Sequence, residues 1–152
     1  MPSLIYLNLQ ENDMVFTTAF EVEAFPRLLF LYLSGNHFQA FPGKKLKTVL
    51  VLDIARCKLV GIPEAVLGYR GLQYLDARDN NLTTVGDDLK SLIAKNNVEA
   101  YFSGNAVCKV DSTLDCEPLC SKTCWGREAP GDGVCNIECN SKECDYDGGD
   151  CK

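Results

Sequence analysis

The residues with the clearest capacity for chemistry are cysteines and aspartates near the end of the 152-residue chain. Six cysteines from Cys120 to Cys151 follow the spacing Cys-x3-Cys-x10-Cys-x3-Cys-x4-Cys-x6-Cys. Cysteines at this density form disulfides or bind a metal, and the interspersed carboxylates suit a hard cation such as Ca²⁺. Because the segment has few large apolar side chains, it needs such cross-links to hold a structure.

Spacing alone leaves more than one form of cross-linking open. Six cysteines can pair in many ways, and their spacing does not choose among the pairings. The separations Cys120/Cys124 and Cys135/Cys139 also occur in Zn²⁺ sites, although the interspersed carboxylates favour disulfides with Ca²⁺. An EF-hand does not fit, because Gly149 breaks the ligand series that its loop requires.

The residues around these cysteines resemble the Notch-type cysteine-rich repeat, the LNR module, over residues 120–151. The likeness rests on three runs: Asp132-Gly133-Val134-Cys135, Cys139-Asn140 and Cys144-Asp145-Tyr146-Asp147-Gly148-Gly149-Asp150-Cys151. The chain departs from the family in a longer gap between Cys124 and Cys135.

The resemblance implies both cross-links and ligands. The implied disulfides are Cys120–Cys144, Cys124–Cys139 and Cys135–Cys151. The implied Ca²⁺ ligands are the carboxylates of Asp132, Asp147 and Asp150 and a backbone carbonyl near Ala129. Cys108 and Cys116 are left over, and we expect them to form a fourth disulfide that closes the last repeat of the preceding part.

The elements before this module follow a repeat, Leu-x-x-Leu-x-Leu-x-x-Asn-x-Leu, whose copies start 24, 21, 23 and 25 residues apart. The copies run Leu4-Leu7-Leu9-Asn12-Met14, Leu28-Leu31-Leu33-Asn36-Phe38, Val49-Leu52-Ile54-Cys57-Leu59, Leu72-Leu75-Ala77-Asn80-Leu82 and, degraded, Asn97-Ala100-Phe102-Asn105-Val107. Residues 1–107 thus resemble the leucine-rich repeat family. The resemblance implies an α/β-type solenoid with parallel strands on its concave face.

Elementary physics accounts for the framed residues. Alternating leucines form a short strand with one apolar face, and stacked copies bury that face in a continuous core. The framed asparagines stand where the chain leaves the strand, where an inward amide satisfies backbone groups of adjacent turns. Cys57 takes this position in the third copy, so we expect it to be a buried, free thiol.

The variable strand residues point outward along the concave face, and several are aromatic or charged. We expect them to form an exposed stripe that binds a protein or glycan ligand. The candidate binding residues are Tyr6, Phe30, Tyr32, Asp53, Tyr74, Asp76, Arg78 and Tyr101. A separate candidate is Asn81, which begins the sequon Asn81-Leu82-Thr83 and is the expected glycosylation site.

Composition and charge narrow the function classes. The net charge of −6 argues against nucleic-acid binding, and no run of apolar residues is long enough to span a membrane. With one histidine, His37, and no nucleophile–base set or phosphate-binding loop, we expect no enzymatic activity. Eight of the nine cysteines follow residue 107, and residues 108–152 carry 10 acidic and 5 basic side chains. Because the composition changes at this point, we interpret residues 108–119 as a capping or joining segment.

These features predict an extracellular or secretory-pathway recognition module. Neither a signal peptide nor an N-terminal cap precedes Leu4, so we expect a fragment of a longer protein or a truncated gene model. Two alternatives stay open. One is Notch-like masking of a cleavage site, and the other is the targeting portion of a larger secreted or receptor-type enzyme.

Overall fold

The structure is a computed structural model that describes residues 3–16, 25–38, 46–117, 120–121, 124, 131 and 133–152. The chain forms two compact units, Met1–Cys116 and Glu117–Lys152. The border between them falls inside the expected joining segment, residues 108–119.

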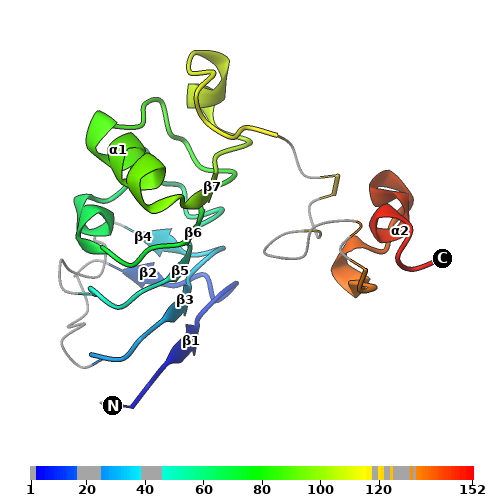
Figure 1. Cartoon of the computed structure of the whole chain (residues 1–152), viewed down its shortest axis with the longest axis horizontal. Coiled ribbons are helices and arrows are strands. Elements are labelled where there is room, and N and C mark those ends of the chain that lie inside the picture. The colour runs from blue at the N-terminus through cyan, green and yellow to red at the C-terminus, as the bar shows by residue number, and fades with distance from the viewer. Residues whose placement is uncertain are drawn as a thin grey trace. The chain divides into compact units, whose positions relative to one another are not determined.

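A parallel sheet of five strands organises the first unit (Figure 1). The strands pair in chain order: β1 (Tyr6–Asn8), β3 (Phe30–Tyr32), β5 (Val51–Asp53), β6 (Tyr74–Asp76) and β7 (Glu99–Tyr101). Their register aligns the framed residues Leu7, Leu31, Leu52, Leu75 and Ala100. The prediction of one parallel strand for each repeat is therefore confirmed.

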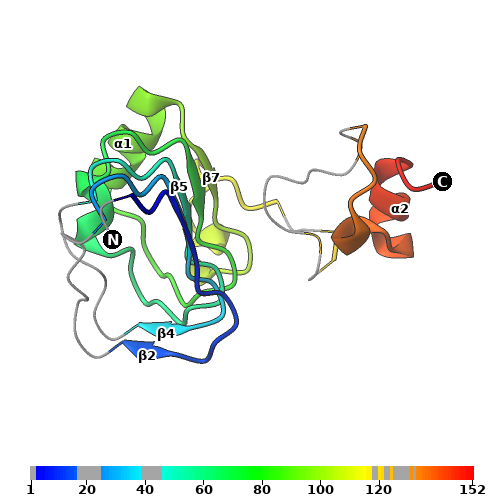
Figure 2. The ribbon, with the colours of Figure 1, turned by 90° about the horizontal axis from the view of Figure 1, so that it is seen from below.

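Two shorter strands, β2 (Val15–Phe16) and β4 (His37–Phe38), form a second parallel pair. They follow the turn of the first and second repeats and lie away from the main sheet (Figure 2). The repeat frame did not predict this pairing, because it fixes an apolar residue at this place but not the backbone conformation.

Helical segments return the chain between the later strands. These are the 3₁₀ helix η2 (Glu64–Gly68), between β5 and β6, and the helix α1 (Asp87–Asn96), between β6 and β7. A further 3₁₀ helix, η3 (Ala106–Lys109), follows the last strand, β7. Asp87 and Asp88 lie in the first turn of α1, where carboxylates complement the helix dipole, and Asn97 ends the helix in a left-handed conformation.

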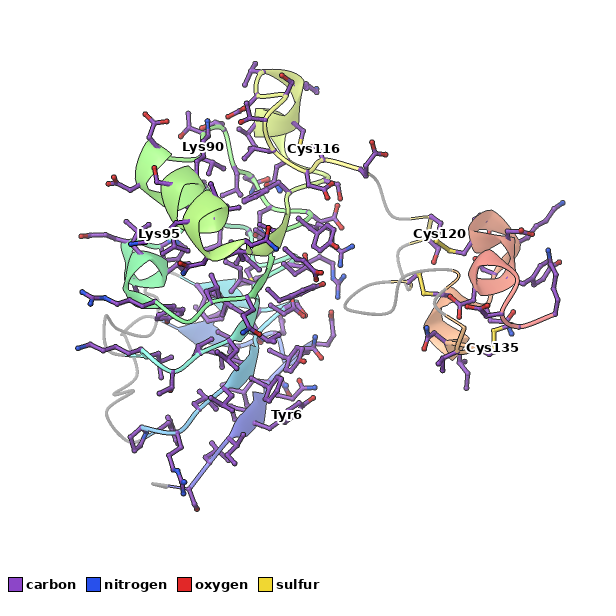
Figure 3. The ribbon with its side chains drawn as sticks, in the orientation of Figure 1. Tyr6, Lys90, Lys95, Cys116, Cys120 and Cys135 are labelled. Carbon is purple, nitrogen blue, oxygen red and sulfur yellow. A yellow bond between two sulfur atoms is a disulfide. The ribbon has the colours of Figure 1, made fainter. Side chains whose placement is uncertain are left out.

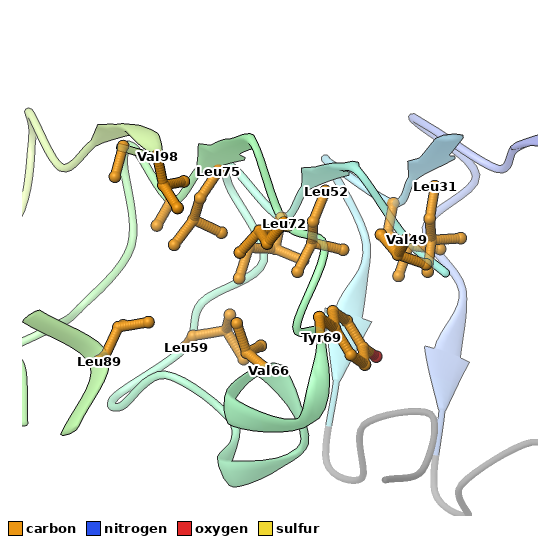
Figure 4. Packing of buried hydrophobic residues seen from close by; sticks show 14 of the residues in the cluster. Leu31, Val49, Leu52, Leu59, Val66, Tyr69, Leu72, Leu75, Leu89 and Val98 are labelled. Carbon is orange, nitrogen blue, oxygen red and sulfur yellow. The ribbon is translucent and has the colours of Figure 1, made fainter. Parts of the chain in front are cut away.

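The core of this unit lies between the strands and these helical segments. Leu52 and Leu75 project from the strands toward Val66 and Tyr69 of the η2 region and Leu89 of α1 (Figure 4). Full burial of each leucine contributes about 2 kcal/mol. Among the described residues, no helix has the length and apolar character that crossing a membrane requires.

Buried asparagines connect adjacent turns, as the repeat frame predicts. The Asn80 amide donates to the Ile54 carbonyl at 2.9 Å, and its oxygen accepts from the Cys57 and Leu59 amides at 3.0 Å each. Asn105 repeats the pattern one turn later. Cys57 is buried and free, and its thiol donates to the Leu33 and Ala55 carbonyls.

The second unit is held mainly by disulfides. It contains η4 (Ile137–Cys139), η5 (Lys142–Cys144) and the short segment α2 (Asp145–Gly148). Its disulfides, Cys120–Cys144, Cys124–Cys139 and Cys135–Cys151, are the pairs that the LNR resemblance implied. The fourth expected disulfide, Cys108–Cys116, lies in the first unit.

Candidate functional site

Residues 145–150 of the second unit form a turn, which we call the acidic turn, whose carboxylates have the chemistry of cation ligands. Asp147 is fully buried, and its Oδ2 accepts a hydrogen bond from the Asn136 amide at 2.6 Å. Its Oδ1 is also buried and has no hydrogen-bond partner among the described residues. Because a buried carboxylate oxygen without a donor is costly, this atom fits a site where a cation is the partner.

Backbone hydrogen bonds bring a second segment against the acidic turn. The Gly131 amide donates to the Asp147 carbonyl at 3.0 Å, and the Gly133 amide donates to Asp150 Oδ2 at 2.7 Å. Residues 131 and 133–136 therefore lie against 147–150. Two of the expected ligand residues, Asp132 and Ala129, lie outside the described residues.

The acidic turn has an unusual backbone. Asp145, Tyr146 and Asp147 have φ values of 49°, 56° and 62°, and Gly148 and Gly149 continue the run at 62° and 105°. Each non-glycine residue in this left-handed region costs about 1–2 kcal/mol. Such cost concentrated around a buried, unpaired carboxylate is typical of a functional site.

The cysteines do not form a zinc site in this structure. The Sγ atoms of Cys120, Cys124 and Cys144 lie within 4.8 Å of one another. All three belong to disulfides, and zinc binds thiolates. The close approach of these sulfurs therefore reflects two neighbouring disulfides that form the small core of the unit.

A second candidate site is the outward face of the sheet. Tyr6 is 53% exposed, and Phe30 and Tyr32 are half-buried. The Tyr6 ring lies 6.2 Å from that of Phe30 and 5.2 Å from that of Tyr32, between centroids. These three rings form a contiguous aromatic surface at the β1 end of the sheet, which we call the aromatic cluster.

The expected exposure of four further residues was wrong. Tyr74, Asp53, Asp76 and Arg78 are buried. The two carboxylates fold back along their own turns, where Asp53 Oδ1 accepts from the Ala55 amide and Asp76 Oδ1 accepts from the Arg78 amide. The Arg78 side chain pairs with Asp76, so the charges satisfy one another within the sheet face.

Aromatic packing accounts for the burial of Tyr74. Its ring lies 5.7 Å from that of half-buried Tyr101, and the Arg78 guanidinium lies 5.4 Å from the Tyr101 ring centre. Burial raises the pKa of the Tyr74 hydroxyl, with a smaller contribution from Asp76. The middle of the sheet face is therefore a packed polar and aromatic layer, and its described ends are the more exposed parts.

Asp53 is the electrostatic centre of this layer. Burial raises its pKa to about 6, and the neighbouring Asp76 carboxylate adds to the shift. Gln10, which the sequence did not mark as a site residue, donates to Asp53 Oδ2 at 2.6 Å and to Ser34 Oγ at 2.9 Å. In the sequence, the only feature that indicated a role for Gln10 was its outward-facing position in the first repeat.

The sequon at Asn81 is accessible. Asn81 and Thr83 are exposed, whereas Leu82 between them is buried in the core. The Asn81 backbone amide donates to the Leu59 carbonyl at 2.8 Å, which fixes the turn that presents its side chain.

Comparisons with known proteins address both parts of the chain. The family model described as "Notch: LNR domain" matches residues 115–152. Transforming growth factor beta activator LRRC33 of Danio rerio is 30% identical over 105 residues, which cover 68% of this chain. The chain spans 15% of the length of that relative. No solved structure matches the chain.

These similarities agree with the geometry at the coarse level. A leucine-rich-repeat-containing relative and an LNR match both point to an extracellular or membrane-associated protein built for interaction. The disulfide-rich end of this chain is a Notch-type LNR domain.

Proposed function

We propose that this chain is a non-enzymatic extracellular recognition module. Residues 1–107 form a leucine-rich-repeat solenoid whose concave face binds a protein or glycan. Residues 108–119 close its last repeat, and residues 120–151 form a calcium-stabilised LNR module. The observation that carries the proposal is the aromatic cluster of Tyr6, Phe30 and Tyr32 on the sheet face.

The aromatic cluster has the properties of a binding surface. Tyrosine offers a large, rigid contact area with a polar tip and is enriched at protein interfaces. Beside it, Gln10 and Ser34 hydrogen-bond to one another, and Gln10 holds Asp53, so the surrounding surface is pre-organised. A pre-organised surface loses little conformational entropy when a ligand binds.

Binding of the full chain to an array of purified extracellular proteins and glycans tests this function. The array includes transforming growth factor beta, because the name of the relative contains it. We expect a ligand that the Tyr6→Ser/Tyr32→Ser variant no longer binds. The matched control is Val60→Ser/Val110→Ser, which removes two exposed apolar side chains outside the aromatic cluster. A ligand bound equally by both variants would contradict the proposed face.

For the LNR module, we propose that Ca²⁺ is held by the carboxylates of Asp132, Asp147 and Asp150 and the carbonyl of Ala129. The unpaired, buried Oδ1 of Asp147 supports this assignment. The ion would supply positive charge to the acidic turn and offset the cost of its left-handed backbone.

Calcium titration of the full chain tests the metal proposal. We expect one site with a Kd of about 10⁻⁴ M, at the tight end of the range for extracellular modules. Asp147→Asn should weaken binding by at least about tenfold, because it removes a ligand charge. Asp145→Asn is the control, since Asp145 is exposed and pairs with Lys152 at 2.6 Å. Equal affinities in the two variants would overturn the assignment.

A second candidate function, favoured by the LNR match, is the masking of a cleavage site in a neighbouring segment of the full protein. Its test is whether Ca²⁺ chelation exposes new proteolytic sites there. We further propose N-glycosylation at Asn81. It is tested by a mass shift on enzymatic deglycosylation of the secreted protein that disappears in Asn81→Gln.

A further inference from the structure

Basic side chains form a row across the repeats, at the edge where the strands begin. Lys47, Arg70 and Lys95 each stand two positions before the first framed residue of the third, fourth and fifth repeats. The strands of these repeats are aligned in the register Val51–Tyr74–Glu99, so the three positions correspond.

Contacts between neighbouring repeats bring these positions side by side. The Asn96 side chain, next to Lys95, donates to the Arg70 carbonyl at 2.9 Å. Gly71 follows Arg70 and lies against the third repeat. A Cβ added to Gly71 would be 3.9 Å from the Lys47 carbonyl oxygen.

The row extends into the second repeat through Arg27. This residue stands one position nearer its strand than the other three cations do in their repeats. The Thr48 hydroxyl donates to the Leu28 carbonyl at 2.8 Å. Thr48 follows Lys47 and Leu28 follows Arg27, so this bond joins the segments that carry the two cations. Adjacent repeats are about 4.8 Å apart at the strands. The basic row therefore carries one positive charge for each repeat over four repeats.

The charges of the basic row are not neutralised within the described part of the chain. Its four side chains are exposed, and none forms an ion pair with a described residue. Other cations are paired, as Arg56 is with Glu11 and Lys90 is with Asp111. The α1 dipole accounts for Lys95, which lies in its last turn, but not for Lys47 or Arg27.

The surface between two members of the row is hollowed. An open depression of about 520 Å³ is lined by Arg70, Ser91, Leu92, Lys95 and Asn96. It thus combines a guanidinium, an ammonium, a hydroxyl and an amide. Sulfate oxygens are hydrogen-bond acceptors, and a guanidinium and an ammonium are the cations that bind such oxyanions.

We propose that the basic row binds a sulfated glycan chain, with one sulfate held in the depression between Arg70 and Lys95. A linear array with one charge per repeat matches a linear polyanion. The net charge of −6 disfavours non-specific binding of polyanions to the rest of the surface, so binding depends on the basic row itself. The LNR match and the relative point to an extracellular or membrane-associated protein, and sulfated glycans occur in that setting.

This site is distinct from the aromatic cluster. Lys95 lies at the end of α1, whereas Tyr6 lies on the outward face of the sheet (Figure 3). The two surfaces allow the protein to be retained on a glycan matrix while the sheet face stays available.

Binding of the Ca²⁺-loaded full chain to immobilised heparin tests the proposal. We expect Arg70→Gln/Lys95→Gln to weaken binding more than about fivefold and to reduce its salt dependence, because fewer counterions are released. The matched control is Lys109→Gln/Lys142→Gln, which removes the same charge from exposed lysines outside the row. Circular dichroism checks that both variants are folded.

Three results would overturn the proposal. They are equal loss of binding in the two double variants, equal binding of the wild type to desulfated heparin, and no binding at low salt. Tyr6→Ser/Tyr32→Ser should bind heparin as the wild type does. The glycan site and the proposed sheet-face function can therefore fail independently.

Discussion

Asp53 lies in the middle of the sheet, where burial and the neighbouring Asp76 both disfavour its charge and raise its pKa to about 6. Because this value is above the unfolded value of 3.8, the folded protein binds more protons than the unfolded chain between these pH values. The contribution of Asp53 to stability is therefore fully present below about pH 4 and is lost as the pH rises through 6.

Asp53→Asn should remove this pH dependence. The amide keeps an oxygen for the Ala55 backbone amide and carries no charge. We expect the variant to be more stable than the wild type at pH 7.5 by about 1–2 kcal/mol, because relief of the charge outweighs a weakened bond from Gln10. Thermal melts from pH 4 to 8 measure this difference, which should shrink toward pH 4. Glu99→Gln, at an exposed strand position, is the control, and a difference that does not vary with pH would contradict the account.

The framed asparagines differ in what they support. Asn80 serves both its own turn and the preceding one. Among the described residues, exposed Asn12 donates only to the Leu9 and Gln10 carbonyls of its own turn. Asn80→Ala leaves buried backbone groups without partners, each costing about 1–3 kcal/mol. We expect urea unfolding to show a loss of at least about 3 kcal/mol for Asn80→Ala and less than about 1 kcal/mol for Asn12→Ala. Equal losses would mean that the ladder does not stabilise the fold.

The framed asparagines and the buried charged residues of the sheet face show what the sequence can predict about single residues. The role of Asn80 follows from its place in the repeat, because the frame fixes which backbone groups it meets. The burial of Asp53 and Arg78 does not follow, because it depends on side chains that fold back onto their own turns and on contacts between repeats. The frame says which way a residue points, but not how densely its neighbours cover it.

Among the elements, the turn after each strand uses a left-handed residue at the same place in every repeat. This position, just before the framed asparagine or cysteine, is Glu11, Gly35, Arg56, Asp79 and Gly104, all with positive φ. The two glycines also leave room for the preceding repeat. A Cβ on Gly104 would lie 2.1 Å from Asp79 Oδ1, and one on Gly35 would lie 2.4 Å from Glu11 Cδ.

Gly104→Ala should therefore destabilise the last turn. A left-handed alanine costs about 1–2 kcal/mol, and the Asp79 side chain must also move. We expect a loss of about 2 kcal/mol in the free energy of unfolding. Gly61→Ala is the matched control, because a Cβ added there would meet no described atom within 4 Å and its φ is not left-handed, so its change should stay within about 0.5 kcal/mol. A similar cost at both sites would argue that the turn tolerates rearrangement.

Sequence predicted these elements unevenly. The leucine alternation located the five strands and their register, because period-two burial leaves few alternatives. The pair β2–β4 and the left-handed run in α2 were not predicted. The former depends on pairing between repeats, and the latter on three non-glycine residues adopting a conformation that their types disfavour.

For the whole molecule, the two units depend on different sources of stability. The sheet unit has an extended apolar core that includes Leu31, Leu52 and Leu75. Among the described residues of the LNR unit, the buried core consists of Cys124, Cys139 and Cys144. Loss of the disulfides, and of the calcium that we propose, therefore removes most of what holds the second unit, but leaves the apolar core of the first in place.

This difference predicts a strict order of proteolysis under mild reduction with a Ca²⁺ chelator. Cleavage should begin within residues 117–152, while a fragment spanning the strands persists, because its cleavage requires opening of the apolar core. Mass spectrometry of the fragments over time measures the order, and the oxidised, Ca²⁺-loaded chain is the control. Cys108–Cys116 breaks under the same conditions, so Cys108→Ser/Cys116→Ser without reductant shows how far that loss alone loosens the sheet unit. Loss of both units at one rate in the reduced wild type, with the double variant resistant, would mean that the sheet unit depends on the LNR module for its stability.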